Sequence, residues 1–353
     1  MKTAFIFPGQ GAQSVGMGRD LYEAFAAARV VFDSAQSITG LPLQKLCFEG
    51  PEEELARTDI CQPAIFTVSA ALLATMSSLL DPENVAQLRP AFMAGLSLGE
   101  YTALYAAGVI SFEDALRLVA RRGAAMQSAA TAVASGMVSV MGVDEAKARE
   151  LCEKAAQGQV LTCANFNCPG QIVLSGQIEA CKRAEAMAKE CGASGAIPLK
   201  VAGAFHSDIM KPASDELAKA LASVQMNQPA APAGSPFDRT APARPEYGQE
   251  FASSDVGVLS NVTAQPYFAS GGDCGCGCGC HTAANQVSQL LQAQLTNPVR
   301  WQQCVEYMVA QGVQRFCEIG PGRVLAGLMR RIDRKAEVVS VNSREALEKL
   351  TVA

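Results

Sequence analysis

The sequence predicts an α/β protein in which a mainly parallel sheet carries a smaller, inserted unit. Two observations lead to this fold class. Short apolar runs that end in glycine-containing turns alternate with longer stretches of helical periodicity, which is typical of a parallel sheet covered by helices. Within residues 131–201 the expected order changes to β-α-β-β-α-β, the split βαβ arrangement.

The chain is long and apolar enough to bury a substantial core. It has 353 residues, of which 49% are hydrophobic and 18% charged, and this balance excludes a disordered chain. The net charge of −5 argues against nucleic-acid binding, because phosphate contacts are made by clustered Lys and Arg. The apolar run before Pro8 is too short for a signal peptide or a membrane span, so we expect a cytoplasmic protein without a membrane partner.

The strand-like runs divide the chain into two domains. Residues 2–7, 91–94 and 315–319 are apolar runs that each precede a glycine turn and a helical stretch, so 1–130 and 202–353 are assigned to one discontinuous α/β domain. The inserted subdomain, 131–201, contains the runs MVSVMGV, QVLTCANFN, QIVLSG and GAIPLKV. Its two helices are expected to begin at Asp144 and Ile178.

Two segments of the large domain lack periodicity and are interpreted as inserted loops. Residues 228–255 hold five prolines among small and charged residues, which predicts a mobile surface loop. Residues 271–281 read GGDCGCGCGCH, a low-complexity stretch. Its residues Cys274, Cys276, Cys278, Cys280 and His281 are candidate ligands for a soft metal such as zinc or copper(I), although the spacing is not that of a zinc finger. A tolerated loop with reduced thiols is the alternative, and the nine other cysteines are interpreted as small buried hydrophobes.

The sharpest chemical signal is Gly95-Leu96-Ser97-Leu98-Gly99, between an apolar run and a helical stretch. Flanking glycines relieve crowding in a tight strand-to-helix turn that exposes the serine Oγ, which is the nucleophile-elbow pattern. A glycine-relieved turn with a serine N-cap is the structural alternative. The strand and helix context favours the catalytic interpretation of Ser97.

A nucleophilic serine needs a base, and the chain has only two histidines. His281 closes the cysteine-rich loop, where nothing would hold an imidazole beside a buried turn. His206 follows an apolar strand and precedes a helix start, so it can reach the edge of the sheet near Ser97. A lone histidine is more often structural, but its pairing with an elbow serine makes His206 the candidate base.

Arg122 falls on the apolar face of the helix expected after the elbow, whereas Arg117 and Arg121 fall outside it. A buried guanidinium needs an anionic partner, which is either an internal carboxylate or a substrate carboxylate.

At the N-terminus, Phe7-Pro8-Gly9-Gln10-Gly11 lacks the third glycine of a dinucleotide fingerprint and the Lys-Ser/Thr pair of a phosphate loop. Its free backbone N–H groups suit a second oxyanion donor instead.

Six motifs in one order resemble the malonyl-CoA:acyl carrier protein transacylases of fatty acid synthesis. They are FPGQGAQ, GLSLGEYTAL, RRGAAMQ, GAFHS, QLTNPVRW and EIGPGRVL, and the resemblance covers all of the chain except the two loops. It implies an α/β-hydrolase-like large domain with a ferredoxin-like subdomain. It also implies malonyl transfer from malonyl-CoA to the phosphopantetheine thiol of acyl carrier protein, with no metal or redox cofactor.

The same resemblance assigns roles to individual residues. Ser97 would be the acylated nucleophile and His206 its base. The backbone amides of Gln10 and Leu98 would form the oxyanion hole, Arg122 would hold the malonyl carboxylate, and the backbone carbonyl of Gln294 would orient the base.

Substrate and partner expectations follow. Phe205, beside the base, resembles the malonyl-preferring form of the motif, whereas Leu96 stands where the family usually has histidine.

Because the carrier protein is expected to be acidic, we expect a basic surface on this protein that binds it. Between residues 300 and 335 seven basic residues stand against three acidic ones, including Arg330, Arg331 and Arg334; a solvated helix explains this excess equally well.

Three other functions stay open on the sequence. They are a freestanding acyltransferase that serves a polyketide carrier protein, a serine hydrolase or thioesterase that uses the same elbow, and a non-enzymatic metal or redox module built on the cysteine loop. A missing acidic partner for His206 and the presence of Arg122 argue against the hydrolase.

Overall fold

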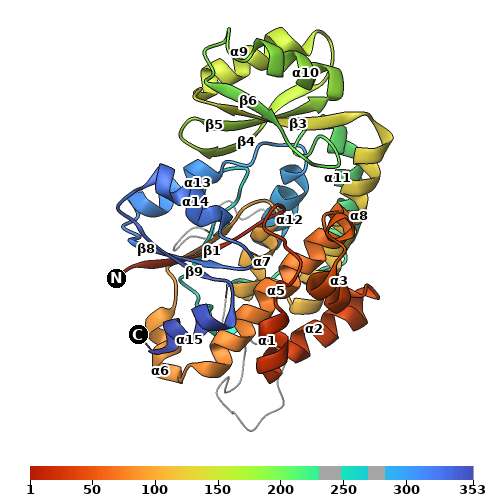
Figure 1. Ribbon diagram of the computed structural model, residues 1–353. Coiled ribbons are helices and arrows are strands. Elements are labelled where there is room, and N and C mark those ends of the chain that lie inside the picture. The colour runs from red at the N-terminus through yellow and green to blue at the C-terminus, as the bar shows by residue number, and fades with distance from the viewer. Residues whose placement is uncertain (230–247, 269–282, 353) are drawn as a thin grey trace, which may run out of the picture.

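The computed structural model describes residues 1–229, 248–268 and 283–352, and it contains two separate sheets (Figure 1). The larger sheet has the strand order β7-β2-β1-β8-β9, and every neighbouring pair is parallel. Its strands are β1 (Thr3–Phe7), β2 (Phe92–Gly95), β7 (Gly257–Val258), β8 (Arg315–Ile319) and β9 (Glu337–Val341). The predicted parallel α/β architecture is confirmed.

The smaller sheet is the split βαβ unit. Its strands are β3 (Ser135–Met141), β4 (Leu161–Cys168), β5 (Gln171–Gln177) and β6 (Gly195–Pro198), and its helices are α9 (Glu145–Ala156) and α10 (Ile178–Met187). The order β4-β5-β3-β6 with antiparallel pairing is that of the ferredoxin-like fold, as predicted. Helix α9 begins as expected after Asp144, whose side chain accepts the Lys147 N–H.

Helices cover both faces of the large sheet (Figure 1). The described helices outside the small unit are α1 (Arg19–Ala24), α2 (Ala26–Thr39), α3 (Leu43–Glu49), α4 (Glu52–Leu55), α5 (Thr58–Leu79), α6 (Pro82–Leu88), α7 (Gly99–Ala106), α8 (Phe112–Ala132), α11 (Lys211–Leu221), α12 (Ala283–Gln294), α13 (Trp301–Ala310), α14 (Val324–Ile332) and α15 (Arg344–Val352), with the 3₁₀ turns η1 (Asp208–Met210) and η2 (Gln249–Phe251).

Strand β1 shows why the sheet needs helices on both sides. All five of its residues are buried. Phe5 and Phe7 pack into the apolar cluster that includes α2, α5 and α8, whereas Ala4 and Ile6 point to the other face, against α13 and α14. Continuous apolar strands of this kind are typical of parallel sheets covered on both faces.

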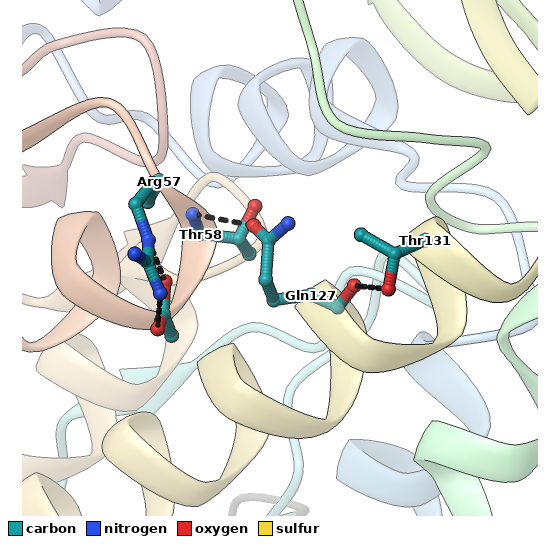
Figure 2. A network of polar contacts seen from close by, with 5 residues as sticks. Arg57, Thr58, Gln127 and Thr131 are labelled. Atoms are coloured by element: carbon teal, nitrogen blue, oxygen red, sulfur yellow. Dashed lines mark hydrogen bonds and ion pairs between the residues drawn. The ribbon is translucent and has the colours of Figure 1, made fainter. Parts of the chain in front are cut away.

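Helix α5 is the centre of the large core. It is long and apolar enough to cross a membrane, with a mean hydropathy of 1.5, but that whole window is buried inside the fold. Gly123 of α8 lets the two helices approach closely, because a Cβ there would lie 2.6 Å from the Thr58 carbonyl oxygen. Figure 2 shows the adjoining bond, in which the Thr58 N–H donates to Gln127 Oε1 at 3.1 Å. The same view shows the Thr131 hydroxyl, which donates to the Gln127 carbonyl oxygen, and Arg57, whose guanidinium forms an ion pair with Asp59.

The proline-rich segment differs in part from the expected surface loop. Residues 230–247 lie outside the described residues, but Gln249, Glu250 and Phe251 are buried. The Gln249 side-chain amide donates to the carbonyl oxygens of Tyr105 and Ile110 at 3.0 and 3.1 Å. The loop-like composition predicted that this side chain would be exposed to solvent, but hydrogen bonds to distant residues allow it to be buried.

The cysteine-rich loop, 271–281, lies entirely outside the described residues, and so do its candidate ligands. Among the residues that the structure does describe, no group of three or more side chains could hold a metal ion. The nine described cysteines are free thiols, and eight of them are buried, as expected for small hydrophobes.

Candidate active site

Ser97 lies in a tight turn between β2 and α7, with a φ of 53°. The flanking glycines are steric requirements of this turn. A Cβ at Gly95 would lie 1.8 Å from the Gly99 carbonyl carbon, and one at Gly99 would lie 2.1 Å from the Phe7 carbonyl oxygen. The left-handed backbone and the absence of two Cβ atoms give Ser97 the geometry of a nucleophile elbow.

His206 is hydrogen-bonded to Ser97, with 2.9 Å between Nε2 and Oγ. On its other side, Nδ1 lies 2.7 Å from the Gln294 carbonyl oxygen, which can only accept, so Nδ1 carries the proton and Nε2 is free to take one. Burial, together with the nearby charge of Arg122, lowers the pKa of His206 to about 4 despite the opposing bond to Gln294. The imidazole is therefore neutral at neutral pH, as a base must be.

The segment that carries His206 is attached to the small sheet. The Ser175 hydroxyl of β5 donates to the Phe205 carbonyl oxygen at 2.6 Å, and the Ala204 N–H donates to the Ser135 hydroxyl of β3 at 3.1 Å. The backbone just before the base is thus anchored to the small sheet, whereas Ser97 directly follows a strand of the large sheet, β2.

Arg122 is 1% exposed and extends from α8 to the serine. Its Nη1 donates to Gln62 Oε1 at 2.7 Å, and its Nη2 donates to Ser97 Oγ at 2.9 Å and to Gln294 Oε1 at 2.8 Å. No ion pair involving this guanidinium occurs among the described residues. Within the described residues, the internal carboxylate considered from the sequence does not contact Arg122, and an external anion is the partner that the sequence analysis left as the alternative.

Two backbone amides border the serine. Leu98 directly precedes α7, and Gln10 follows β1 in a loop that touches the elbow, since a Cβ at Gly9 would lie 2.3 Å from the Leu96 carbonyl oxygen. Within the described chain neither the Leu98 nor the Gln10 N–H donates to another protein atom. Both donors are available to an oxygen that develops negative charge.

The structure also reveals support that sequence reasoning missed. Asn261 Oδ1 accepts the Ser97 N–H at 2.7 Å, and Asn261 Nδ2 donates to the Gly95 carbonyl oxygen at 2.8 Å, which fixes both ends of the elbow. Glu100 and Gln62 are buried around Arg122. No sequence signal identified these residues, because isolated polar side chains carry no periodicity.

The predicted site residues therefore divide into three groups. Ser97, His206, Arg122 and Gln294 meet through hydrogen bonds, and Gln10 and Leu98 lie beside them. The basic residues Arg330, Arg331 and Arg334 are exposed at the end of α14 and the turn after it, outside this centre. The cysteine-loop candidates lie outside the described residues.

Comparison with known proteins decides the family. Residues 4–265 match the acyl transferase domain. A malonyl CoA-acyl carrier protein transacylase of Escherichia coli K12 is 39% identical over 344 residues, which cover 98% of this chain and 97% of that one. The chain belongs to the malonyl CoA-acyl carrier protein transacylase family.

Solved structures of the transacylase family agree with the fold. An acyl carrier protein S-malonyltransferase from Vibrio cholerae superposes with a TM-score of 0.82 at 37% identity, covering 99% of this chain and 100% of that one. A malonyl-transacylase solved in complex with a type II polyketide acyl carrier protein gives 0.83 at 35% identity, with coverage of 100% and 99%. Because the transacylase neighbours match both sheets across nearly the full length, this protein is an acyltransferase of the same architecture.

Proposed function

We propose that this protein transfers a malonyl group from malonyl-CoA to the phosphopantetheine thiol of an acyl carrier protein, in fatty acid biosynthesis. The observation that carries the proposal is the buried guanidinium of Arg122, which has no carboxylate partner among the described residues and contacts the same serine oxygen as His206. A thioester whose acyl group ends in a carboxylate suits this arrangement, because one end can meet Ser97 while the other pairs with Arg122.

In the first half-reaction, His206 Nε2 takes the proton of the Ser97 hydroxyl as Oγ attacks the thioester carbonyl carbon. The resulting oxyanion accepts the N–H groups of Gln10 and Leu98. The C–S bond then breaks, the histidine returns its proton to the departing CoA sulfur, and malonyl-serine remains. In the second half-reaction the carrier thiol gives its proton to His206 and attacks the ester carbonyl. The bond between the acyl carbon and Ser97 Oγ then breaks, and His206 returns the proton to Oγ, which restores the serine hydroxyl.

Arg122 supports selection of the malonyl group. To pair with a substrate carboxylate, its Nη2 exchanges the neutral Ser97 hydroxyl for an acceptor of opposite charge, whose two oxygens can be bound by the guanidinium together. An acetyl group offers no such acceptor, so acetyl-CoA leaves the guanidinium unpaired in a buried site. The bulky Phe205 beside the base supports malonyl over larger branched acyl groups.

The proposal includes the organisation of the chain and its surroundings. We retain the division into a discontinuous large domain, 1–130 and 202–353, and an inserted subdomain, 131–201. The exposed arginines at the end of α14 are the proposed attraction for an acidic carrier protein. We propose a cytoplasmic location, and a mechanism through Ser97 that requires no metal or redox cofactor.

The test is the intact mass of the protein after separate mixing with malonyl-CoA and acetyl-CoA. Wild type should gain the mass of one malonyl group rapidly and that of an acetyl group slowly. Ser97→Ala should gain neither, while Arg122→Met should lose the preference for malonyl. Absence of a malonyl adduct on wild type, with no hydrolysis of malonyl-CoA, would refute the proposed function.

Two alternatives have distinct outcomes. A polyketide carrier is favoured by the similarity to a transacylase solved with such a partner, and it would be revealed by faster transfer to that carrier than to a fatty acid carrier. A hydrolase would release malonate from malonyl-CoA without any carrier thiol. The carbonyl partner of His206 Nδ1, in place of a carboxylate, argues against this second alternative.

A further inference from the structure

Glu100 is a buried carboxylate that the proposed reaction does not use, and the inference drawn from it rests on that proposed function. It lies in the first turn of α7, three residues after Ser97, and is 0% exposed. Oε1 accepts the Asn261 N–H at 3.2 Å and the Tyr267 hydroxyl, and Oε2 accepts the Gln294 side-chain amide. All three neighbours are donors, which suits an ionised carboxylate, an acceptor at both oxygens.

Gln294 connects this carboxylate to Arg122. Its Nε2 donates to Glu100, and its Oε1 accepts Arg122 Nη2 at 2.8 Å. The same Nε2 also lies 3.0 Å from the Ser97 carbonyl oxygen. One amide therefore separates a buried anion from a buried cation that do not touch each other.

The orientation of that amide depends on the charge of Glu100. If the Gln294 amide were reversed, its NH₂ group would face the guanidinium, donor against donor, and its oxygen would face the carboxylate, acceptor against acceptor. An ionised Glu100 thus fixes the oxygen of Gln294 toward Arg122. The carboxylate also offsets the charge of Arg122 without occupying it, which leaves the guanidinium free for a substrate.

We propose that Glu100 is a positioning residue that sets the preference for malonyl by holding Arg122, through the Gln294 side chain, in place for the substrate carboxylate. The residue is not catalytic, because it touches none of the reacting atoms. Base and nucleophile keep their contacts in Glu100→Gln, since His206 bonds to the backbone of Gln294, the Ser97 N–H bonds to Asn261, and the amide oxygen of the variant can still accept the Asn261 N–H. Loss of Glu100 should therefore affect a malonyl substrate far more than an acetyl one.

The charge state sets the conditions for a test. Burial raises the pKa of Glu100 to about 7, an effect opposed by its three hydrogen bonds and by the charge of Arg122. The facing Tyr267 has a pKa raised well above its ordinary value by burial, and it remains a neutral donor. Measurements at pH 8 keep Glu100 ionised.

The experiment compares single-turnover acylation of Ser97 by malonyl-CoA and by acetyl-CoA at pH 8, followed by intact mass, in wild type and Glu100→Gln. The matched control is Glu318→Gln. Glu318 is also 0% exposed and accepts three donors, the N–H groups of Leu325 and Ala326 and the Ser340 hydroxyl, away from the site. In Glu100→Gln the malonyl-to-acetyl rate ratio should fall by about tenfold to a hundredfold, the range expected for a lost hydrogen bond to a charged group. Glu318→Gln should keep the wild-type ratio.

A second variant guards against misfolding. In the double variant Glu100→Gln with Gln294→Glu, carboxylate and amide exchange places and the net charge is unchanged. The carboxylate would then pair directly with Arg122 and occupy it, so the malonyl-to-acetyl rate ratio should again fall below that of wild type.

The proposal is overturned if either site variant keeps the wild-type ratio, if both rates fall in equal proportion, or if Glu318→Gln loses the ratio as well. An absence of malonyl acylation in wild type would instead refute the proposed function, and the role of Glu100 with it. The two failures are therefore distinguishable in one set of measurements.

Discussion

The low pKa of His206 predicts an unusual pH dependence for acylation. Burial and the charge of Arg122 lower this pKa from 6.5 to about 4. At pH 5.5 an ordinary histidine would be neutral in about one molecule in eleven, whereas His206 would be neutral in nearly all, a difference of about tenfold in active base. The acylation rate should therefore change little between pH 8 and pH 5.5.

The assay is single-turnover acylation by acetyl-CoA between pH 4.5 and 8, followed by intact mass. Acetyl-CoA is chosen because its acyl group makes no use of Arg122, so the titration of Glu100 near pH 7 should not distort the profile. Ser97→Ala provides the background. A rate that halves near pH 6.5 would refute the reasoning, because it would mean that the imidazole is not held neutral by its surroundings.

The lowered pKa of His206 should also be visible in the pH dependence of the free energy of unfolding. Because the folded pKa is below the unfolded one, the unfolded state binds a proton first as the pH falls, and stability is lost between pH 6.5 and about 4. At about 1.4 kcal/mol per pH unit, the full loss is about 3 kcal/mol. Denaturant titrations of wild type and His206→Asn should isolate this contribution, since other groups titrate equally in both. Parallel pH dependences in the two proteins would contradict it.

Further predictions concern packing, the elbow and the carrier surface. Gly123→Ala should lower the free energy of unfolding by about 1–3 kcal/mol, because its Cβ would lie 2.6 Å from the Thr58 carbonyl oxygen; denaturant titration tests this, and an unchanged midpoint would contradict it. Asn261→Ala leaves the Ser97 N–H and the Gly95 carbonyl oxygen unpartnered, so malonyl and acetyl acylation should fall together by about tenfold or more, and a loss confined to malonyl would argue against this role. Replacing Arg330, Arg331 and Arg334 with glutamine should raise the KM for carrier protein while CoA-dependent acylation stays constant; an unchanged KM would remove the proposed docking surface.

Residues with a local pattern could be located from the sequence. The elbow glycines have a steric signature, and the structure shows the contacts that require them. Helical periodicity separated Arg122 from Arg117 and Arg121, and the structure buries the first and exposes the other two. His206 was found by elimination, since the chain has one rival histidine.

Residues defined by tertiary partners could not be located in this way. Glu100 stands in the first turn of a helix, where an acidic residue is ordinarily solvated, and only the meeting of α7, α12 and the segment around Asn261 buries it. Gln249 belongs to a segment of loop-like composition, yet it satisfies two carbonyl oxygens at the end of α7 and before α8. In each case the partner lies more than 100 residues away in the chain, beyond the reach of any local pattern.

The attachment of His206 to the small sheet has a consequence for protein engineering. Ser97 and His206 are both outside the small sheet, but the backbone before His206 is anchored to that sheet, so the 2.9 Å contact between Oγ and Nε2 depends on where the small sheet lies. A subdomain transplanted from a relative would have to bring the hydroxyls of Ser135 and Ser175 with it, because these two anchors, together with the Gln294 carbonyl, hold the base in position. Chimeras joined without them should fold as two intact halves and yet be slow catalysts, since a misplacement of about 1 Å can lower a rate by about a hundredfold.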